Sequence, residues 1–315
     1  MSFAAPQRII AEGDIVILYI SINNMHAIEV KKQIMNKHGI LVEYTHQTTY
    51  GALKVENLIG KEYGGKVELS RGYAYVLQPN PELWTNNLPH RTQILYTPDI
   101  SMILLQLEAK PGSIIIEAGT GSGSLSHYFL RAIKETGHLY TFDFHESRVE
   151  QAKEEFKKHG LGDFVTVQHR DVCSDGFTEE LTGVADAVFL DLPAPYLAIG
   201  HVVKALKLNG GRFCGFSPCI EQTQATCVEL EKNGFLEIQT MEIIQSEHIV
   251  KDKHIPVIDL EFVKTKREDD ILQTAKDQKK QPGKTKKVLT TIPPPMQPGH
   301  SGYLTFATLP PLSMR

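Results

Sequence analysis

The strongest constraint on the fold is an alternation of apolar, strand-like segments with amphipathic, helix-like segments between residues 98 and 245. The predicted strands cover residues 113–118, 138–144, 164–170, 185–191, 211–217 and 235–243. The predicted helices between them cover residues 124–133, 147–159, 199–206 and 220–233. Nearly continuous apolar strands that alternate with helices indicate a parallel sheet covered by helices on both faces. We therefore predict an α/β fold for this part of the chain.

The regions on either side of this segment differ from it in amino-acid composition. Residues 1–85 are rich in β-branched and aromatic residues separated by glycines and asparagines, which predicts a small N-terminal β domain. Residues 264–298 are rich in lysine and proline, and we expect a flexible insertion there. Order should return with a strand at 302–308, which we expect to pair with the strand at 235–243. The predicted α/β domain is thus 86–263 plus 299–310.

Composition excludes several classes of protein. The chain has 315 residues, four cysteines and a formal net charge of −4. No cysteine pair has CxxC spacing, so we expect a reducing compartment, no disulfide framework and no metal site. The longest apolar run, 15–22, falls far short of the ~20 residues that cross a bilayer, so we expect no membrane segment. The net charge argues against a strongly basic nucleic-acid-binding surface, although the acidic excess lies within 99–263.

A glycine loop follows the first predicted strand of the α/β region. Residues 119–123 read Gly-Thr-Gly-Ser-Gly, and Glu117 lies two positions before the first glycine. The dinucleotide fingerprint would place its third glycine at Ser124 instead. The observed spacing resembles the loop of Rossmann-like methyltransferases that use S-adenosylmethionine, whose ammonium group a carboxylate can hold. The alternative is a tight strand–helix turn that binds no ligand.

Three further acids each follow a predicted strand at its carboxyl end, where open α/β sheets bind ligands. Asp143 has the spacing at which an acid reaches ribose hydroxyls, and Asp171 with Val172 could contact an adenine ring. Asp191 begins the run Asp-Leu-Pro-Ala-Pro-Tyr, which is similar to a turn whose carbonyl holds an exocyclic amine in enzymes that methylate nucleic-acid amines. Arg148 either approaches the cofactor or pairs with a nearby carboxylate.

Several motifs together resemble one family closely, the catalytic subunits of eukaryotic tRNA (adenine-58-N1)-methyltransferases. These motifs lie at 81–84, 88–96, 117–124, 186–191, 210–222 and 302–308. The resemblance covers nearly the whole chain except the insertion and the loop near 35–50. It implies a Rossmann-like S-adenosylmethionine-dependent methyltransferase sheet behind the small N-terminal β domain.

The resemblance also implies roles for individual residues. The implied cofactor set is Leu95, Ser122, Gly123, Ser124, Leu125, Ser126, His127, Asp143, Arg148, Asp171, Val172 and Asp191. The glycine-loop motif adds Glu117, Gly119 and Gly121 to this set. The tRNA-contacting set is Gln93, Ile94, Tyr96, Thr97, Leu190, Leu192, Pro193, Ser217, Pro218, Cys219, Ile220 and Ser301, within segments that include 215–222. Asp191 is also the implied catalytic acid–base residue. Relatives often carry Glu where this chain has Asp143.

Partners and location follow as expectations. The family implies tRNA as substrate and a paralogous, non-catalytic tRNA-binding subunit, in a hetero-tetramer of two such pairs. The lysine-rich run 279–287 is similar to a nuclear localisation signal, which predicts a nuclear protein, although an RNA-contacting tail or a solvated loop would have the same composition. Two other functions stay open, namely methylation of a protein or small molecule and a non-catalytic RNA-binding subunit.

Overall fold

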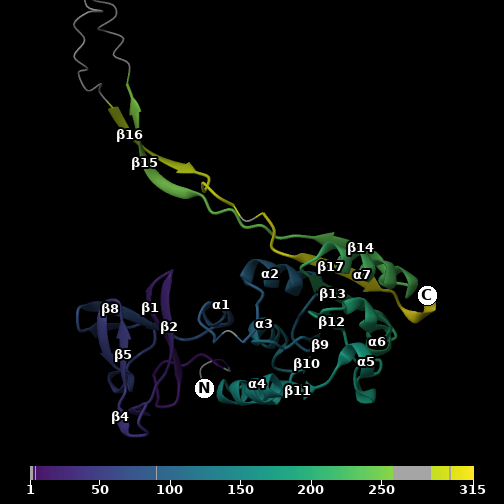
Figure 1. Ribbon diagram of the computed structural model, residues 1–315, viewed down its shortest axis with the longest axis horizontal. Coiled ribbons are helices and arrows are strands. Elements are labelled where there is room, and N and C mark those ends of the chain that lie inside the picture. Colours follow the sequence, from purple (N-terminus) through teal and green to yellow (C-terminus); the bar gives the residue numbers. More distant parts are fainter. Residues whose placement is uncertain (1–2, 4, 90, 258–284, 298) are drawn as a thin grey trace, which may run out of the picture. The chain divides into compact units, whose positions relative to one another are not determined.

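The computed structural model describes residue 3 and residues 5–89, 91–257, 285–297 and 299–315. The chain divides into two compact units (Figure 1). The first comprises Met1–Ile243 and Ser301–Arg315, and the second comprises Ile244–His300. The first unit contains the predicted N-terminal β region and the predicted α/β region as far as Ile243. Residues 244–257, which we expected to belong to the α/β domain, are instead part of the second unit.

The N-terminal region is built on a four-stranded antiparallel sheet with the strand order β2-β1-β8-β7. Its strands are β1 (Ile15–Ser21), β2 (Asn24–Glu29), β7 (Lys66–Leu69) and β8 (Gly72–Leu77). The region also contains two separate antiparallel hairpins. One pairs β3 (Gln33–Met35) with β4 (Leu41–Glu43), and the other pairs β5 (Thr45–Thr48) with β6 (Gly51–Lys54). Residues alternate between buried and exposed along β7 and β8, so one face packs on a core.

The α/β region is a seven-stranded sheet with the order β11-β10-β9-β12-β13-β17-β14. Its strands are β9 (Ile114–Ala118), β10 (His138–Asp143), β11 (Val165–His169), β12 (Ala187–Leu190), β13 (Gly211–Ser217), β14 (Leu236–Met241) and β17 (Tyr303–Leu309). The first five strands in chain order pair in parallel, which confirms the predicted α/β fold. All six strands predicted within 113–243 are present, with ends that differ by no more than two residues.

Helices separate the strands. They are α1 (Pro81–Thr85), α2 (Thr97–Gln106), α3 (Ser124–Ile133), α4 (Glu146–Lys158), α5 (Val172–Asp175), α6 (Ile199–Ala205) and α7 (Ile220–Lys232). Short 3-10 helices cover Val55–Leu58, Gly162–Phe164, Glu179–Leu181, Pro195–Ala198 and Leu312–Met314. The Asn80 side chain caps the start of α1 by accepting a hydrogen bond from the Leu83 amide.

Alternate residues of the central strands enter two separate cores. Ile115 and Phe189 pack with residues of α2, α3 and α4, whereas Ile116 and Val188 pack with residues of α5, α6 and α7. All four residues of β12 are buried because both faces of the sheet are covered. The helices therefore hold the strand ends, and the loops that leave them, in fixed positions.

The strand predicted at 302–308 is β17, and its expected pairing with β14 is confirmed. β17 also pairs antiparallel with β13 along seven residues, so it separates β13 from β14 within the sheet. Gly302 has a φ of 138°, and a Cβ atom there would lie 2.3 Å from the Phe216 ring. Glycine therefore allows the chain to enter β17 alongside the end of β13.

The second unit differs from the prediction of a flexible insertion at 264–298. β15 (Ile249–Pro256) pairs antiparallel with β16 (Thr285–Ile292) along eight residues. The prediction is thus wrong for residues 285–292, where backbone pairing between two polar segments outweighs their composition. Residues 264–284 lie outside the described residues, so most of that insertion stays a prediction, as does the boundary at residue 85.

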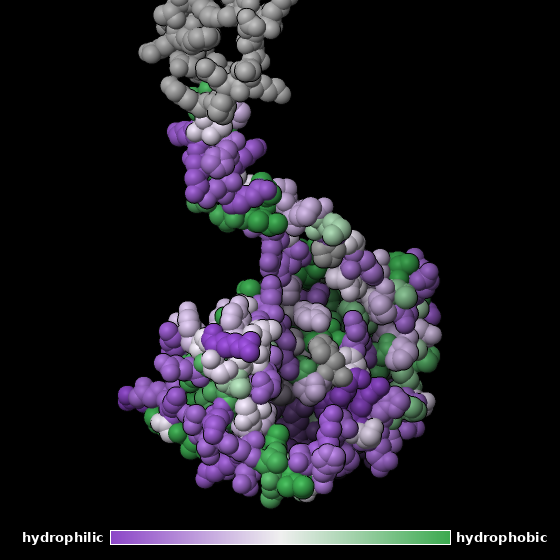
Figure 2. Space-filling view, turned by 60° about the vertical axis from the view of Figure 1, so that its left-hand side comes forward, coloured by the Kyte–Doolittle hydropathy of each residue, from purple (hydrophilic) through white to green (hydrophobic). Residues whose placement is uncertain are grey.

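Among the described residues, no helix combines the length and apolar character needed to cross a bilayer. On the face of the first unit that Figure 2 shows, hydrophilic side chains predominate and hydrophobic ones form small groups. Phe129, Phe142 and Phe189 are among the large apolar side chains that are fully buried, whereas others such as Leu105 and Phe144 are exposed.

Candidate functional site

The glycine loop at 119–123 joins the end of β9 to the start of α3. Gly119, Gly121 and Gly123 all have positive φ angles, of 99°, 54° and 76°. A Cβ atom at Gly119 would lie 2.3 Å from the backbone carbonyl oxygen of Asp191. The loop therefore passes directly against the end of β12, at an approach that only glycine permits.

Glu117 lies at the base of this loop and is almost fully buried, with 1% of its surface exposed. Its Oε2 accepts hydrogen bonds from Ser126 Oγ at 2.6 Å and Thr141 Oγ1 at 2.7 Å. Burial raises the pKa of Glu117 to about 7, and the two hydroxyl donors oppose that rise. A cationic group nearby would favour the ionised form of Glu117.

Asp143 closes β10 on the other side of the loop. Its Oδ2 accepts a hydrogen bond from the Gly121 amide at 2.9 Å, and its Oδ1 accepts one from the His145 amide at 2.9 Å. Arg148 Nη1 lies 3.7 Å from Asp143 Oδ1, so the structure pairs Arg148 with this carboxylate. Each carboxylate oxygen has a second lone pair, which leaves room for a hydroxyl donor.

Asp191 follows β12 and lines the same space. Burial, with a smaller contribution from the charge of Asp143, raises the pKa of Asp191 to about 6. Within the described residues, no hydrogen-bond donor reaches its carboxylate. Asp191 is therefore the acid of this group whose charge is least compensated by the protein.

These residues surround a cavity of about 660 Å³. From the predicted cofactor set it is lined by Leu95, Gly119, Gly121, Asp143, Arg148 and Asp191. From the predicted tRNA set it is lined by Gln93, Ile94, Tyr96, Leu192, Pro193, Pro218 and Ser301. A smaller hollow of about 30 Å³ shares several of these residues and adds Glu117, Ser122, Gly123, Ser124 and Leu125. The structure thus brings most residues of both sets around two hollows that share lining residues.

Other residues of the two sets do not line either hollow. Leu190, Val172 and Ser217 are buried, and Ser126 and His127 lie inside α3. Asp171 caps α5 by accepting hydrogen bonds from the Cys173 amide and Ser174 Oγ, and Thr97 contacts the Tyr128 hydroxyl. Cys219 and Ile220 are exposed at the start of α7. Their ligand-binding roles stay predictions.

The cavity also contains two residues that the sequence reasoning missed, Thr92 and Asp99. One carboxylate oxygen of Asp99 is buried without a hydrogen-bond partner, and burial raises the pKa of the group. An acid in the first turn of a helix is usually a capping residue, so the sequence carried no signal that Asp99 faces a cavity. Gln222, within the predicted segment 215–222, donates from Nε2 to the Pro193 carbonyl at 2.8 Å and steadies the turn after β12.

Comparison with known proteins identifies the family. The sequence profile described as "tRNA methyltransferase complex GCD14 subunit" matches residues 72–309. The chain belongs to this family. It is 45% identical over 250 residues to the tRNA (adenine(58)-N(1))-methyltransferase catalytic subunit TRM61 of Candida albicans, covering 77% of this chain and 70% of the relative. It is 43% identical to the corresponding catalytic subunit of Dictyostelium discoideum, covering 76% and 74%.

Solved structures agree on the fold of this tRNA methyltransferase. A SAM-dependent O-methyltransferase from Thermotoga maritima superposes with a TM-score of 0.72 at 26% identity, covering 96% of this chain and 95% of that one. A tRNA (m1A58) methyltransferase from Aquifex aeolicus superposes with a TM-score of 0.67 at 21% identity, covering 95% and 98%. The cofactor is S-adenosylmethionine, and the residues present suit it, because the cavity offers buried carboxylates to a cation and a glycine loop that permits close contact.

The buried carboxyl of Glu117 should make the stability of the cofactor-free protein depend on pH. Its folded-state pKa is raised, so the folded state binds this proton more tightly than the unfolded state, and stability falls as pH rises from about 4.5 to about 7. Glu117→Gln keeps an acceptor for Ser126 and Thr141 without the charge. We expect its melting temperature to exceed that of the unsubstituted protein by a few degrees at pH 8, and the difference to vanish near pH 5.

Thermal melts at both pH values measure this effect. Glu150→Gln, an exposed position on α4, serves as the matched control and should change the melting temperature little at either pH. An equal gain for Glu117→Gln at pH 5 and pH 8 would contradict the assignment.

Proposed function

We propose that this chain transfers a methyl group from S-adenosylmethionine to N1 of adenine 58 of tRNA. The observation that carries this proposal is the cavity in which the uncompensated carboxylate of Asp191 faces the space between the glycine loop and the Pro193 turn. The family and the catalytic-subunit relatives support the same activity.

The glycine-loop side of the cavity would hold the cofactor. Glu117 can attract its ammonium group, and Asp143 can accept hydrogen bonds from its ribose hydroxyls. Bound S-adenosylmethionine supplies the methyl group on a positively charged sulfur. The protein's part is to orient this group toward the side of the cavity that would hold the base, and to exclude water from the cavity.

The opposite side of the cavity would hold the base. Tyr96 and Pro193 line this side, and Gln222 fixes the carbonyl of Pro193. A T-loop adenine must leave its stack to enter, which costs a few kcal/mol. Methylation at N1 gives the base a positive charge shared with N6. The Asp191 carboxylate beside the N6 amino group would therefore interact more strongly with the transition state than with the substrate.

Removing the charge of Asp191 tests this role. Asp191→Asn preserves shape and an acceptor oxygen, and we expect a loss of about 10²–10³ in kcat with only a modest fall in cofactor affinity. The kcat/KM of the unsubstituted enzyme should rise with pH through about 6 as Asp191 ionises, and the variant should lack this limb.

Steady-state methylation of tRNA between pH 5 and pH 8 provides the measurement. Asp163→Asn, an exposed acid in a 3-10 helix, is the control and should retain the rate and the pH profile. A near-normal rate for Asp191→Asn would exclude the assignment.

We further propose that the chain works with a paralogous, non-catalytic tRNA-binding subunit, in a hetero-tetramer of two such pairs, in the nucleus. The description of the family as subunits of a complex supports an assembly. The net charge of −4 supports a partner that supplies positive surface for the tRNA backbone. The lysine-rich run 279–287 supports the nuclear location and lies mostly outside the described residues.

Purification and assay of the tagged chain test the proposed partner and the proposed acceptor base. We expect a second protein to copurify in a one-to-one ratio, and the purified material to methylate a tRNA transcript that carries adenine 58 but not one in which that base is replaced. A transcript with a different adenine replaced is the control. Methyl transfer that persists without adenine 58, or that goes to lysate protein instead, would contradict the proposed acceptor.

A further inference from the structure

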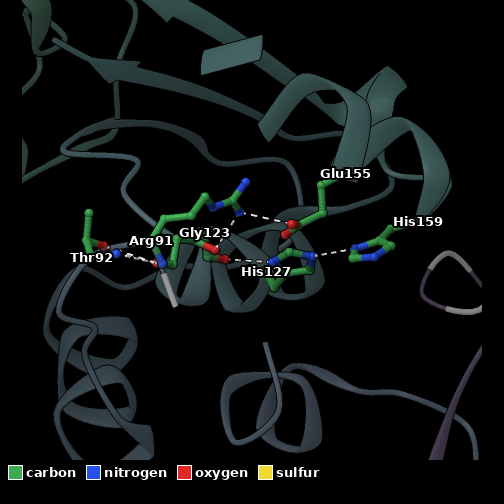
Figure 3. Close-up of polar contacts among 7 residues, drawn as sticks. Arg91, Thr92, Gly123, His127, Glu155 and His159 are labelled. Atoms are coloured by element: carbon green, nitrogen blue, oxygen red, sulfur yellow. Dashed lines mark hydrogen bonds and ion pairs between the residues drawn. The ribbon is translucent and has the colours of Figure 1, made fainter. Parts of the chain in front are cut away.

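Two side chains outside the glycine loop, those of Arg91 and His127, contact backbone carbonyls of the loop. Arg91 donates from Nη2 to the Ser122 carbonyl at 3.1 Å, and its amide donates to Ser122 Oγ at 2.9 Å. The Thr92 amide donates a second hydrogen bond to Ser122 Oγ, at 3.0 Å. His127 Nδ1 lies 2.6 Å from the Gly123 carbonyl oxygen (Figure 3). Two consecutive carbonyls of the loop therefore have donors outside the loop backbone.

Arg91 and His127 are themselves held by residues at the end of α4. Arg91 Nη2 also donates to Glu155 Oε2 at 2.9 Å, and both side chains are only 14% exposed. His127 Nε2 lies 2.8 Å from His159 Nδ1. Because the Gly123 carbonyl can only accept, His127 must donate from Nδ1, and its Nε2 then accepts from His159. Burial lowers the pKa of His127 to about 4 and that of His159 to about 2, so both rings are neutral at pH 7.

Aromatic side chains enclose this network. Phe3 stacks on the His159 ring with centroids 4.2 Å apart, and the Trp84 ring meets His159 edge-on at 4.8 Å. Phe156 packs against His127 at 5.1 Å. Water is thus kept from the hydrogen bond between the His127 and His159 rings, each only 1% exposed, which strengthens it relative to an exposed one.

The same cluster has ligand-type atoms for a metal ion, since those of His127, Glu155 and His159 lie within 4.8 Å of one another. An ion would have to replace the hydrogen bond between the two imidazoles and compete with Arg91 for Glu155. The hydrogen bonds already satisfy both facing nitrogens, and Arg91 neutralises the carboxylate. The contacts accordingly favour a hydrogen-bonded network without a metal, in which Arg91 Nε and Glu155 Oε1 are the buried atoms left without a hydrogen-bond partner.

Holding the Ser122 carbonyl also fixes the rest of that peptide group. The Gly123 amide, on the other side of the same planar peptide, donates to the Thr120 carbonyl at 2.9 Å and closes the loop. On the cavity side, Asp143 accepts from the Gly121 amide. The loop is therefore held at two points, by Asp143 at the Gly121 amide and by Arg91 at the Ser122 carbonyl.

We propose that Arg91 is a positioning residue for the cofactor, which keeps the glycine loop in its binding shape through Ser122 and is oriented in turn by Glu155. This inference rests on the proposed function, because it takes the glycine loop as the cofactor site. Arg91 does not touch the cofactor in this proposal. Its loss should therefore weaken cofactor binding while the chemical step, which depends on Asp191, changes much less.

Arg91→Gln is expected to raise the Kd for S-adenosylhomocysteine, and the KM for S-adenosylmethionine, by about tenfold or more, with less than about a threefold change in kcat. Arg91→Lys, which keeps the charge and a donor, should restore part of the affinity. Because Glu155 acts through Arg91, the double variant Arg91→Gln/Glu155→Gln should bind no more weakly than Arg91→Gln alone. Calorimetry and steady-state kinetics on the full-length chain, in the complex in which it purifies, give these values.

Arg131→Gln is the matched control. Arg131 lies near the end of α3 away from the glycine loop and forms two hydrogen bonds with the Glu82 carboxylate of α1. This variant should leave the Kd and both kinetic constants unchanged. The role proposed for Arg91 would be overturned, with the proposed function left standing, by either of two results. One is an Arg91→Gln variant that binds S-adenosylhomocysteine as tightly as Arg131→Gln does, and the other is a double variant that binds it more weakly than Arg91→Gln. Absence of cofactor binding by the unsubstituted chain would overturn the proposed function as well. One equivalent of tightly bound metal in the purified protein would overturn the hydrogen-bonded network.

Discussion

The close approach of Gly119 to the backbone carbonyl of Asp191 is the constraint on which the site depends. It joins the ends of β9 and β12, which are neighbouring strands of the parallel sheet, at a spacing that excludes any side chain. The glycine loop can then turn over the sheet edge, and α3 begins where the loop ends. The two cores on either side of the sheet keep these strand ends in place. Site geometry and core packing are thus parts of one arrangement.

Gathering three carboxylates at one edge of the sheet has an electrostatic cost. Each is at least partly buried, and the charge of Asp143 raises the pKa of both Glu117 and Asp191. Two backbone amides offset the charge of Asp143, two hydroxyls offset part of that of Glu117, and Asp191 has neither. A site of this kind favours cations. The cofactor is one, and a base methylated at N1 is another.

Much of the fold and of the cavity could be predicted from sequence, because both depend on local patterns. Apolar runs marked the strands, and glycines and acids marked the strand ends that face a ligand. What could not be predicted depends on contacts between distant segments. Arg91 and Glu155 carry no periodic or motif signal that relates them, and no pattern in the sequence marks Asp99 as facing the cavity. The β15–β16 hairpin was missed because its strands are polar and lysine-rich, and only their mutual pairing makes them strands.

The position of β17 has a consequence for how this protein is made. β14 pairs with no strand except β17 in the described sheet, and about 60 residues separate the two in the chain. While the ribosome is still synthesising those residues, β13 and β14 present open edges that attract other extended chains. The N-terminal sheet and the first five strands of the large sheet can form earlier. Completion of the sheet is therefore a late, non-local step, and a nascent chain would need shielding from aggregation until β17 emerges.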